Sequence, residues 1–146
     1  MLVAHLDRDH LLSLPHSKFG GSSPGEVETF RLEFLVNDPR GVICWEAFDA
    51  GRDTEWSYLH EEFHVCMSGG AHVVFTLPPN HQKVLETDIK AGDAVLILAG
   101  TRARFTVPAE EPYVHVSLFS PRYEYAKYLL EEDYGRLQHR PRRSVL

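Results

Sequence analysis

The stretch VETFRLEFLV (27–36) decides the fold class. In it, apolar side chains alternate with polar ones, at Phe30, Leu32, Phe34 and Val36. A period of two places these side chains on one face of an extended chain, which is typical of a half-buried β-strand. The turn-forming residues NDPRG (37–41) follow directly, so we expect the chain to fold back there into a second strand.

Short strand-like segments continue along the chain at a regular spacing. We expect them over 42–48, 56–67, 71–77, 84–89, 94–98, 103–107 and 113–119. Turns rich in Gly and Pro separate them, a pattern typical of an antiparallel sandwich or barrel. Ser120-Pro121 then has the signature of a helix N-terminus, and four arginines follow in the last stretch. We predict an N-terminal arm over 1–26, an all-β barrel over 27–121, and a C-terminal helix with a basic tail over 122–146.

Composition narrows the class of protein. The 146 residues carry 15 Lys and Arg against 21 Asp and Glu, a formal net charge of −6. This acidic balance argues against a nucleic-acid partner, and no apolar run is long enough for a membrane span. The two cysteines, Cys44 and Cys66, each lie in a strand-like apolar run, and we interpret them as buried thiols in a reducing compartment. We therefore expect a single cytoplasmic domain.

Two stretches resemble the paired motifs of the cupin superfamily. The first is YLHEEFHVCMSG (58–69), in which Glu62 and Gly69 have the spacing of the family glutamate and glycine. The second is IKAGDAVLILAGT (89–101), with Gly92-Asp93 and Gly100 at the family positions. The resemblance covers roughly 27–121 and implies an antiparallel jelly-roll β-barrel, to which we add the short C-terminal helix.

Two branches of the superfamily are most similar. FDAGRDTEWSY (48–58), followed by Glu62-Phe63, is similar to the small cupins related to the ethanolamine-utilisation and ureidoglycine-processing proteins. The opening MLV, the stretch 31–41, VCMSG (65–69) and EEDYG (131–135) resemble ectoine synthase, a cupin that closes a ring by losing water. Together these similarities favour the small-enzyme branch.

The departures from the family pattern bear on function. Metal-binding cupins carry two histidines shortly before the glutamate, and here those places hold Glu55 and Ser57, or Trp56 and Tyr58. The histidine of the second motif is replaced by Ala103, and the tyrosine that ectoine synthase uses by Val95. The resemblance therefore implies a cupin without the usual three-histidine metal centre, and one that is not an ectoine synthase.

The informative chemical cluster is His60, Glu62 and His64. Residues two apart in a strand share a face, so Glu62 and His64 are expected to point into the barrel together, with His60 at the strand entrance. Two imidazoles and a carboxylate are a plausible ligand set for Zn, Fe, Mn or Ni. They can equally act as a metal-free acid–base group, or be satisfied by hydrogen bonds with Glu62 paired to an arginine. All three interpretations stay open.

Other residues complete the candidate site. Tyr58 is a candidate catalytic hydroxyl beside Glu62 and His64, and Trp56 a candidate wall of an apolar pocket. Arg102 and Arg104 flank the lost histidine and are candidates for binding a substrate carboxylate. His115 is a candidate for substrate binding, and either it or His72 can supply a further metal ligand.

Three function classes compete. The first is a cupin enzyme that catalyses cyclisation, dehydration or isomerisation of a small molecule. The second is a metal-dependent cupin oxygenase, and the third is a non-catalytic ligand-binding cupin. In each case we expect a homodimer that pairs through an N-terminal strand.

Overall fold

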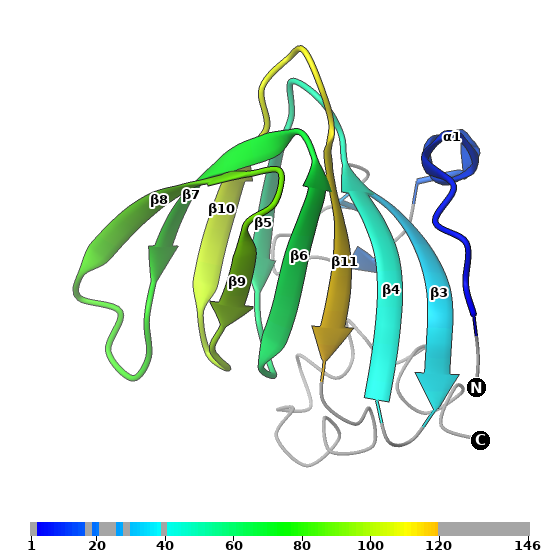
Figure 1. Cartoon of the computed structure of the whole chain (residues 1–146). Coiled ribbons are helices and arrows are strands. Elements are labelled where there is room, and N and C mark those ends of the chain that lie inside the picture. Colours follow the sequence, from blue (N-terminus) through cyan, green and yellow to red (C-terminus); the bar gives the residue numbers. More distant parts are fainter. Residues whose placement is uncertain (1–2, 17–18, 21–25, 28–29, 39–40, 120–146) are drawn as a thin grey trace.

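Antiparallel strands form most of the fold. The computed structural model describes residues 3–16, 19–20, 26–27, 30–38 and 41–119. One sheet has five strands in the order β3-β4-β11-β6-β9, and the other has four in the order β5-β10-β7-β8. The two sheets face each other as a jelly-roll barrel (Figure 1), which confirms the predicted fold class. The predicted C-terminal helix and basic tail lie outside the described residues.

The strands follow the alternation in the sequence closely. In the five-stranded sheet they are β3 (Phe30–Asp38), β4 (Gly41–Phe48), β6 (Glu62–Ser68), β9 (Ala94–Ile97) and β11 (Tyr113–Phe119). In the four-stranded sheet they are β5 (Asp53–Ser57), β7 (Gly70–Thr76), β8 (Val84–Lys90) and β10 (Arg102–Thr106). A short separate pair consists of β1 (Phe19–Gly20) and β2 (Glu26–Val27).

One predicted strand was wrong. The segment expected over 56–67 is divided, because β5 ends at Ser57 in the four-stranded sheet and β6 begins at Glu62 in the other. The linking residues 58–61 cross between the sheets. The Tyr58 amide donates to the Thr101 carbonyl at 2.9 Å and its carbonyl accepts from the Gly100 amide at 2.7 Å, which fixes the start of the crossing.

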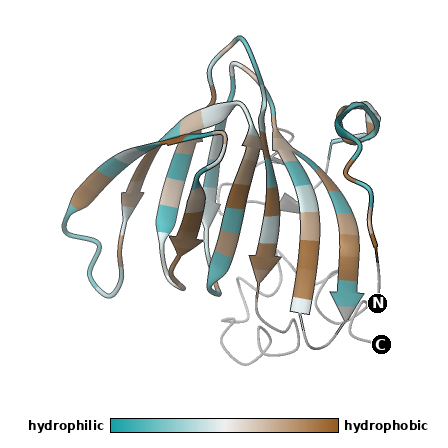
Figure 2. Cartoon of the chain, in the orientation of Figure 1, coloured by the Kyte–Doolittle hydropathy of each residue, from teal (hydrophilic) through white to brown (hydrophobic). Residues whose placement is uncertain are grey.

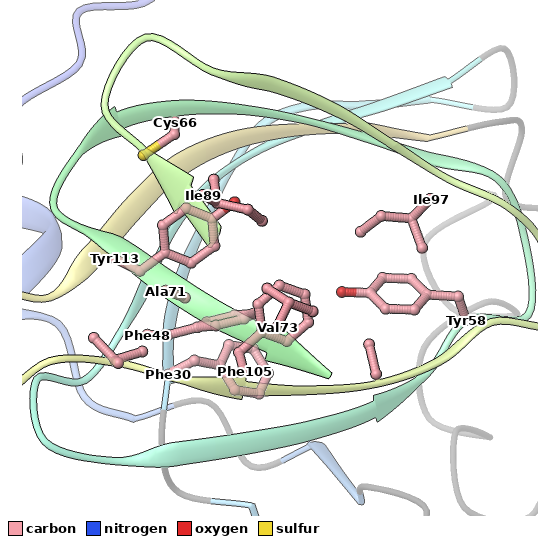
Figure 3. Packing of buried hydrophobic residues seen from close by; sticks show 12 residues of the cluster. Phe30, Phe48, Tyr58, Cys66, Ala71, Val73, Ile89, Ile97, Phe105 and Tyr113 are labelled. Carbon is pink, nitrogen blue, oxygen red and sulfur yellow. The ribbon is translucent and has the colours of Figure 1, made fainter. Parts of the chain in front are cut away.

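The core fills the space between the sheets and is densest toward one end of the barrel. Phe48, Phe105 and Tyr113 are buried there and their rings meet edge to face or stacked at 5.2–6.1 Å. Figure 3 shows Phe48, Phe105 and Val73 gathered together, with Tyr58 and Ile97 to one side. On the inner face of β3, Phe34 is 38% exposed.

A second, smaller core lies outside the barrel. The helix α1 (Arg8–Ser13) begins after Asp7, whose side chain accepts a hydrogen bond from the His10 amide at 3.0 Å. Its Leu11 is fully buried and packs with Trp45 on the outer face of the five-stranded sheet. Figure 2 shows the apolar bands of the strands that this helix lies beside in Figure 1. Part of the predicted arm is therefore packed on the barrel.

Two properties of the described residues complete the fold. None of the helices in that part of the chain has the length and apolar character needed to cross a membrane. Cys44 and Cys66 are buried and not joined in a disulfide, and burial raises the pKa of Cys66 to about 11. The Cys66 thiol is therefore protonated at neutral pH.

Candidate functional site

The inner face of β6 carries the residues around which the candidate site is built. Glu62, His64 and Cys66 alternate on this face and are buried, while Phe63 and Met67 point outward and are exposed. The register brings Glu62 opposite Phe119 and His64 opposite Ser117 on the neighbouring strand β11. The predicted shared face of Glu62 and His64 is therefore present.

Glu62 lies between two imidazole rings. The Nε2 atom of His60 donates to one carboxylate oxygen at 2.9 Å, and the Nε2 atom of His64 donates to the other at 2.8 Å. Burial by itself would raise the pKa of Glu62, but the hydrogen bonds from His60 and His64 outweigh it and hold that pKa well below its usual range. Glu62 is therefore an anion at neutral pH, and both Nε2 atoms must carry hydrogens to bond to it.

His64 is held from both sides. Its Nδ1 atom lies 3.2 Å from the hydroxyl of Tyr113, which is a donor because burial raises the Tyr113 pKa far above neutral. With Nε2 bonded to Glu62, this contact fixes the tautomer of His64 and the orientation of its ring. Since His64 is buried and both nitrogens are engaged, it orients Glu62 and offers no open atom to a substrate.

A second carboxylate–imidazole pair lies beside the first. The ring of His115, on β11, stacks on His64 at 4.2 Å and on Tyr113 at 4.3 Å. Its Nε2 atom is 3.2 Å from a carboxylate oxygen of Glu46, which is directly opposite it on β4. The other Glu46 oxygen accepts from the Ser117 hydroxyl at 2.8 Å. Burial, together with His64, lowers the pKa of His115, so its ring is neutral at pH 7.

Together these residues form a continuous polar band across the inner face of the five-stranded sheet. The band runs from β4 through β11 to β6 and the residues just before β6. We call it the polar band, and its members are Glu46, Ser117, His115, His64, Glu62 and His60. The two histidines at its centre are buried, whereas Glu46, Glu62 and His60 keep 12%, 8% and 11% of their side chains exposed. The two carboxylates and His60 are therefore the members of the band that keep some contact with solvent.

The remaining inner-face candidates are apolar or deeply buried. Trp56 is half-buried and its ring meets Phe30 edge to face at 6.1 Å, which fits a pocket wall. Tyr58 is buried with its ring 6.2 Å from that of His64. Burial, and then the charge of Glu62, raises the Tyr58 pKa well above its ordinary value, so this phenol is a poorer acid than a free tyrosine.

The structure places three predicted residues away from this band. Arg102 and Arg104 are exposed on the outer face of β10, because Ala103 and Phe105 occupy its inner face. Arg104 is paired with Asp53 there. His72 is exposed on β7 and its Nδ1 atom bonds Asp88 at 2.8 Å. Their proposed roles with Glu62 gain no support from this placement.

The candidate metal ligands do not form a site for a divalent metal. Within the described residues, no group of three or more His, Cys, Asp and Glu side chains is arranged to hold a metal ion. His60 and His64 direct their Nε2 atoms at the two Glu62 oxygens, so the predicted ligands bond to one another. As placed, His60, Glu62 and His64 do not fit a metal, and His72 cannot join them from the outer face of the other sheet.

Sequence reasoning missed two of the six members of the polar band. Glu46 and Ser117 were not among the candidates, and neither was Tyr113. A signal for Glu46 existed, because it lies on the same face of β4 as Cys44 and Phe48, where a lone acid among apolar residues needs a partner. The direct pairing of β4 with β11 supplies that partner, and no local pattern reveals this pairing.

Comparisons with known proteins identify the fold. No family model matches the chain, and no curated protein matches it. Among solved structures it is similar to the EutQ protein of Clostridium difficile, at 14% identity and a TM-score of 0.55, over 82% of this chain and 94% of that one. KdgF from Halomonas sp. matches at 19% identity and a TM-score of 0.52, over 66% of this chain and 84% of that one. A Cupin 2 conserved barrel domain protein from Salinispora arenicola CNS-205 matches at 20% identity and a TM-score of 0.52, over 68% and 82%.

Proposed function

We propose that this chain, which has the cupin fold, is an enzyme that moves protons on a small molecule inside its barrel. The reaction class is cyclisation, dehydration or isomerisation, each of which needs only placed acids and bases. The observation that carries the proposal is the Glu62 carboxylate held between the rings of His60 and His64 on the inner face of the barrel.

The roles divide by charge and exposure. Glu62 accepts two hydrogen bonds and has a lowered pKa, so by itself it is a weak base. A carboxylate in this position orients the neighbouring imidazole and stabilises the imidazolium formed when that ring takes up a proton. We therefore assign proton acceptance to the His60 ring, whose Nδ1 atom is buried in the ligand-free molecule and is uncovered when substrate binds.

His64 and Tyr113 are positioning residues in this proposal. The Tyr113 hydroxyl holds His64, and His64 holds the second oxygen of Glu62. The carboxylate can then rotate only by breaking one of two hydrogen bonds, so His60 keeps its direction. Electrostatic preorganisation of this kind avoids reorganisation when charge moves in the reaction.

The experiment is a turnover screen with matched variants. The purified chain is incubated with pools of small polar metabolites, and products are detected by mass spectrometry and NMR. We expect products that are isomers of a substrate or that have lost one water. His60→Ala and Glu62→Gln should reduce turnover by about 10²–10⁴-fold, whereas His72→Ala and Glu86→Gln, which alter exposed residues of the outer face, should not. Products that have gained oxygen would contradict the proposal.

Two alternatives are outcomes of the same screen. A metal-dependent oxygenase requires Zn, Fe, Mn or Ni to copurify with the untagged protein, and metal analysis measures this directly. A non-catalytic cupin binds a metabolite without converting it. The cytoplasmic location and the absence of a nucleic-acid partner stay predictions from composition.

We also propose a homodimer. Large apolar side chains are exposed on the outer face of the five-stranded sheet, at Phe63, Met67, Leu96 and Leu118. Phe63 is in register with Leu118 on one side and Leu96 on the other, so these three form one continuous row. Such a row supports pairing through this face in place of an N-terminal strand. Light scattering should give a dimer mass that Leu96→Glu abolishes and Val84→Glu, on the other sheet, preserves.

A further inference from the structure

The polar band has an unbalanced charge. Its two carboxylates, Glu46 and Glu62, are the ionisable side chains that keep some exposure on the inner face besides His60. The arginines placed by the described strands point outward: Arg31 pairs with Asp49, and Arg102 and Arg104 are exposed. Within those strands, no lysine or arginine faces the barrel interior, so the band presents negative charge to whatever enters.

Glu46 belongs to an incomplete hydrogen-bond arrangement. The His115 ring beside it is fully buried, and within the described residues neither ring nitrogen has a hydrogen-bond partner. Its Nε2 atom is within 3.2 Å of Glu46, but the angle is outside that of a hydrogen bond. Leaving a buried polar group unpaired costs free energy, which a ligand can restore by bonding there.

The missing partner has a defined chemistry. The second oxygen of the Glu46 carboxylate is an acceptor, and the neutral imidazole of His115 has one donor and one acceptor nitrogen, so a ligand that binds at Glu46 must donate to the carboxylate. An ammonium has three donors and no acceptor, and its charge complements Glu46. A carboxylate or phosphate ligand would instead face two like charges in a desolvated site.

Aromatic rings flank both carboxylates. Phe34 is opposite Cys44, two residues from Glu46 along β4, and is partly exposed. Phe119 is opposite Glu62, with its ring 4.7 Å from that of His60. The faces of aromatic rings attract cations, and this attraction strengthens where water is excluded.

We infer that the site selects a small organic cation, and that Glu46, which accepts a hydrogen bond from Ser117 and lies beside His115, is its ammonium-binding residue. This inference rests on the proposed function only in naming the substrate class of the same barrel. Glu46 binds the charged end of the ligand, and the Glu62–His60 pair then meets the part of the ligand that reacts. The sequence-based candidates did not include Glu46.

The test uses three probes of one chain length and different charge. These are 1,5-diaminopentane, glutarate and 1,5-pentanediol, titrated into the full chain at neutral pH and physiological ionic strength. Chemical shifts of the backbone amides of Glu46 and His115 report binding in the barrel, including weak binding. We expect the diamine to shift these amides and to bind at least about tenfold more tightly than the other two, since a charge-assisted hydrogen bond is worth roughly that factor.

Variants locate the binding. Glu46→Gln should weaken diamine binding about tenfold or more, and Ser117→Ala less, because it removes only the donor that orients Glu46. Glu86→Gln, the same change on the outer face of the other sheet, should leave binding unchanged. The inference is overturned if glutarate or pentanediol binds as tightly as the diamine, if no probe shifts these amides, or if Glu86→Gln weakens binding as much. Should Glu46→Gln not fold, the order of the three probes and Ser117→Ala decide.

These results are separate from the test of catalysis. An active enzyme without a preference for the diamine would refute the cation assignment alone. A chain that binds the diamine through Glu46 but converts no metabolite would refute the proposed reaction and leave the binding assignment in place.

Discussion

Gly69 connects β6, which carries Glu62 and His64, to the opposite sheet, and its replacement by alanine should be severe. Its φ of +68° is a left-handed conformation that costs a residue with a Cβ atom about 1–2 kcal/mol. An added Cβ would also lie 2.1 Å from the carbonyl oxygen of Pro112, which is backbone and cannot rotate away. Forced overlap in a packed region typically adds about 1–3 kcal/mol.

Two neighbouring glycines separate these costs. Gly92 has a φ of +92° but nothing within 4 Å of an added Cβ, so Gly92→Ala carries the conformational cost alone. Gly70 has no positive φ, but its Cβ would lie 2.2 Å from the Ile89 carbonyl oxygen, so Gly70→Ala carries the steric cost alone. Gly69→Ala carries both, and we expect it to lose about 2–5 kcal/mol of unfolding free energy.

Urea denaturation of the three variants and the parent measures these losses. At roughly 2–4 °C of melting temperature per kcal/mol for a chain of this size, thermal unfolding resolves them as well. The expected order of stability loss puts Gly69→Ala above both of the others. If Gly69→Ala is no less stable than Gly92→Ala, the close approach of Pro112 does not constrain this connection and the reasoning fails.

Three further predictions concern charge and packing. The pKa of Glu62 is lowered in the folded state, so its carboxylate stabilises the fold above the ordinary carboxyl pKa of about 4.3, and this stabilisation is lost as the pH falls through the folded-state value. The difference in unfolding free energy between parent and Glu62→Gln, measured in urea, should therefore be largest near neutral pH and shrink in acid. Burial lowers the pKa of His115, so its Hε1 NMR resonance should keep its neutral position as the pH falls through about 6.5, and a shift there would show that the ring becomes charged. Leu11→Ala should cost about 2–5 kcal/mol because Leu11 is fully buried against Trp45, whereas the partly buried Leu12 should cost less, and equal losses in urea would mean that α1 does not pack as described.

The strands could be predicted because the alternation that produces them lies within a few consecutive residues. Alternation in a stretch such as 27–36 reflects one buried and one exposed face, and the structure has β3 there from Phe30. The crossing at 58–61 could not be predicted in this way, because the chain is extended on both sides of it. Only the pairing of β5 with β10 and of β6 with β11 shows that the chain changes sheets.

The candidate site was predicted along one strand and missed across strands. Glu62 and His64 share one face of β6 and His60 is two residues before that strand, so their closeness in sequence brings them together. Glu46 and His115 are brought together only by strand pairing, and the sequence alone does not show which strands pair. Arg102 and Arg104 were assigned from their place beside a family position, but the alternation along β10 turns them to the outer face.

The crossing at 58–61 places His60 on the segment that links the two sheets. Backbone hydrogen bonds join Tyr58 to Gly100 and Thr101, just before β10 of the four-stranded sheet, and the chain enters the five-stranded sheet at Glu62. His60 lies halfway along this segment and its Nε2 atom is bonded to the Glu62 carboxylate at one end of it. A change in the separation of the two sheets would extend or shorten this segment. The distance between the His60 ring and the Glu62 carboxylate should therefore report how far apart the sheets are.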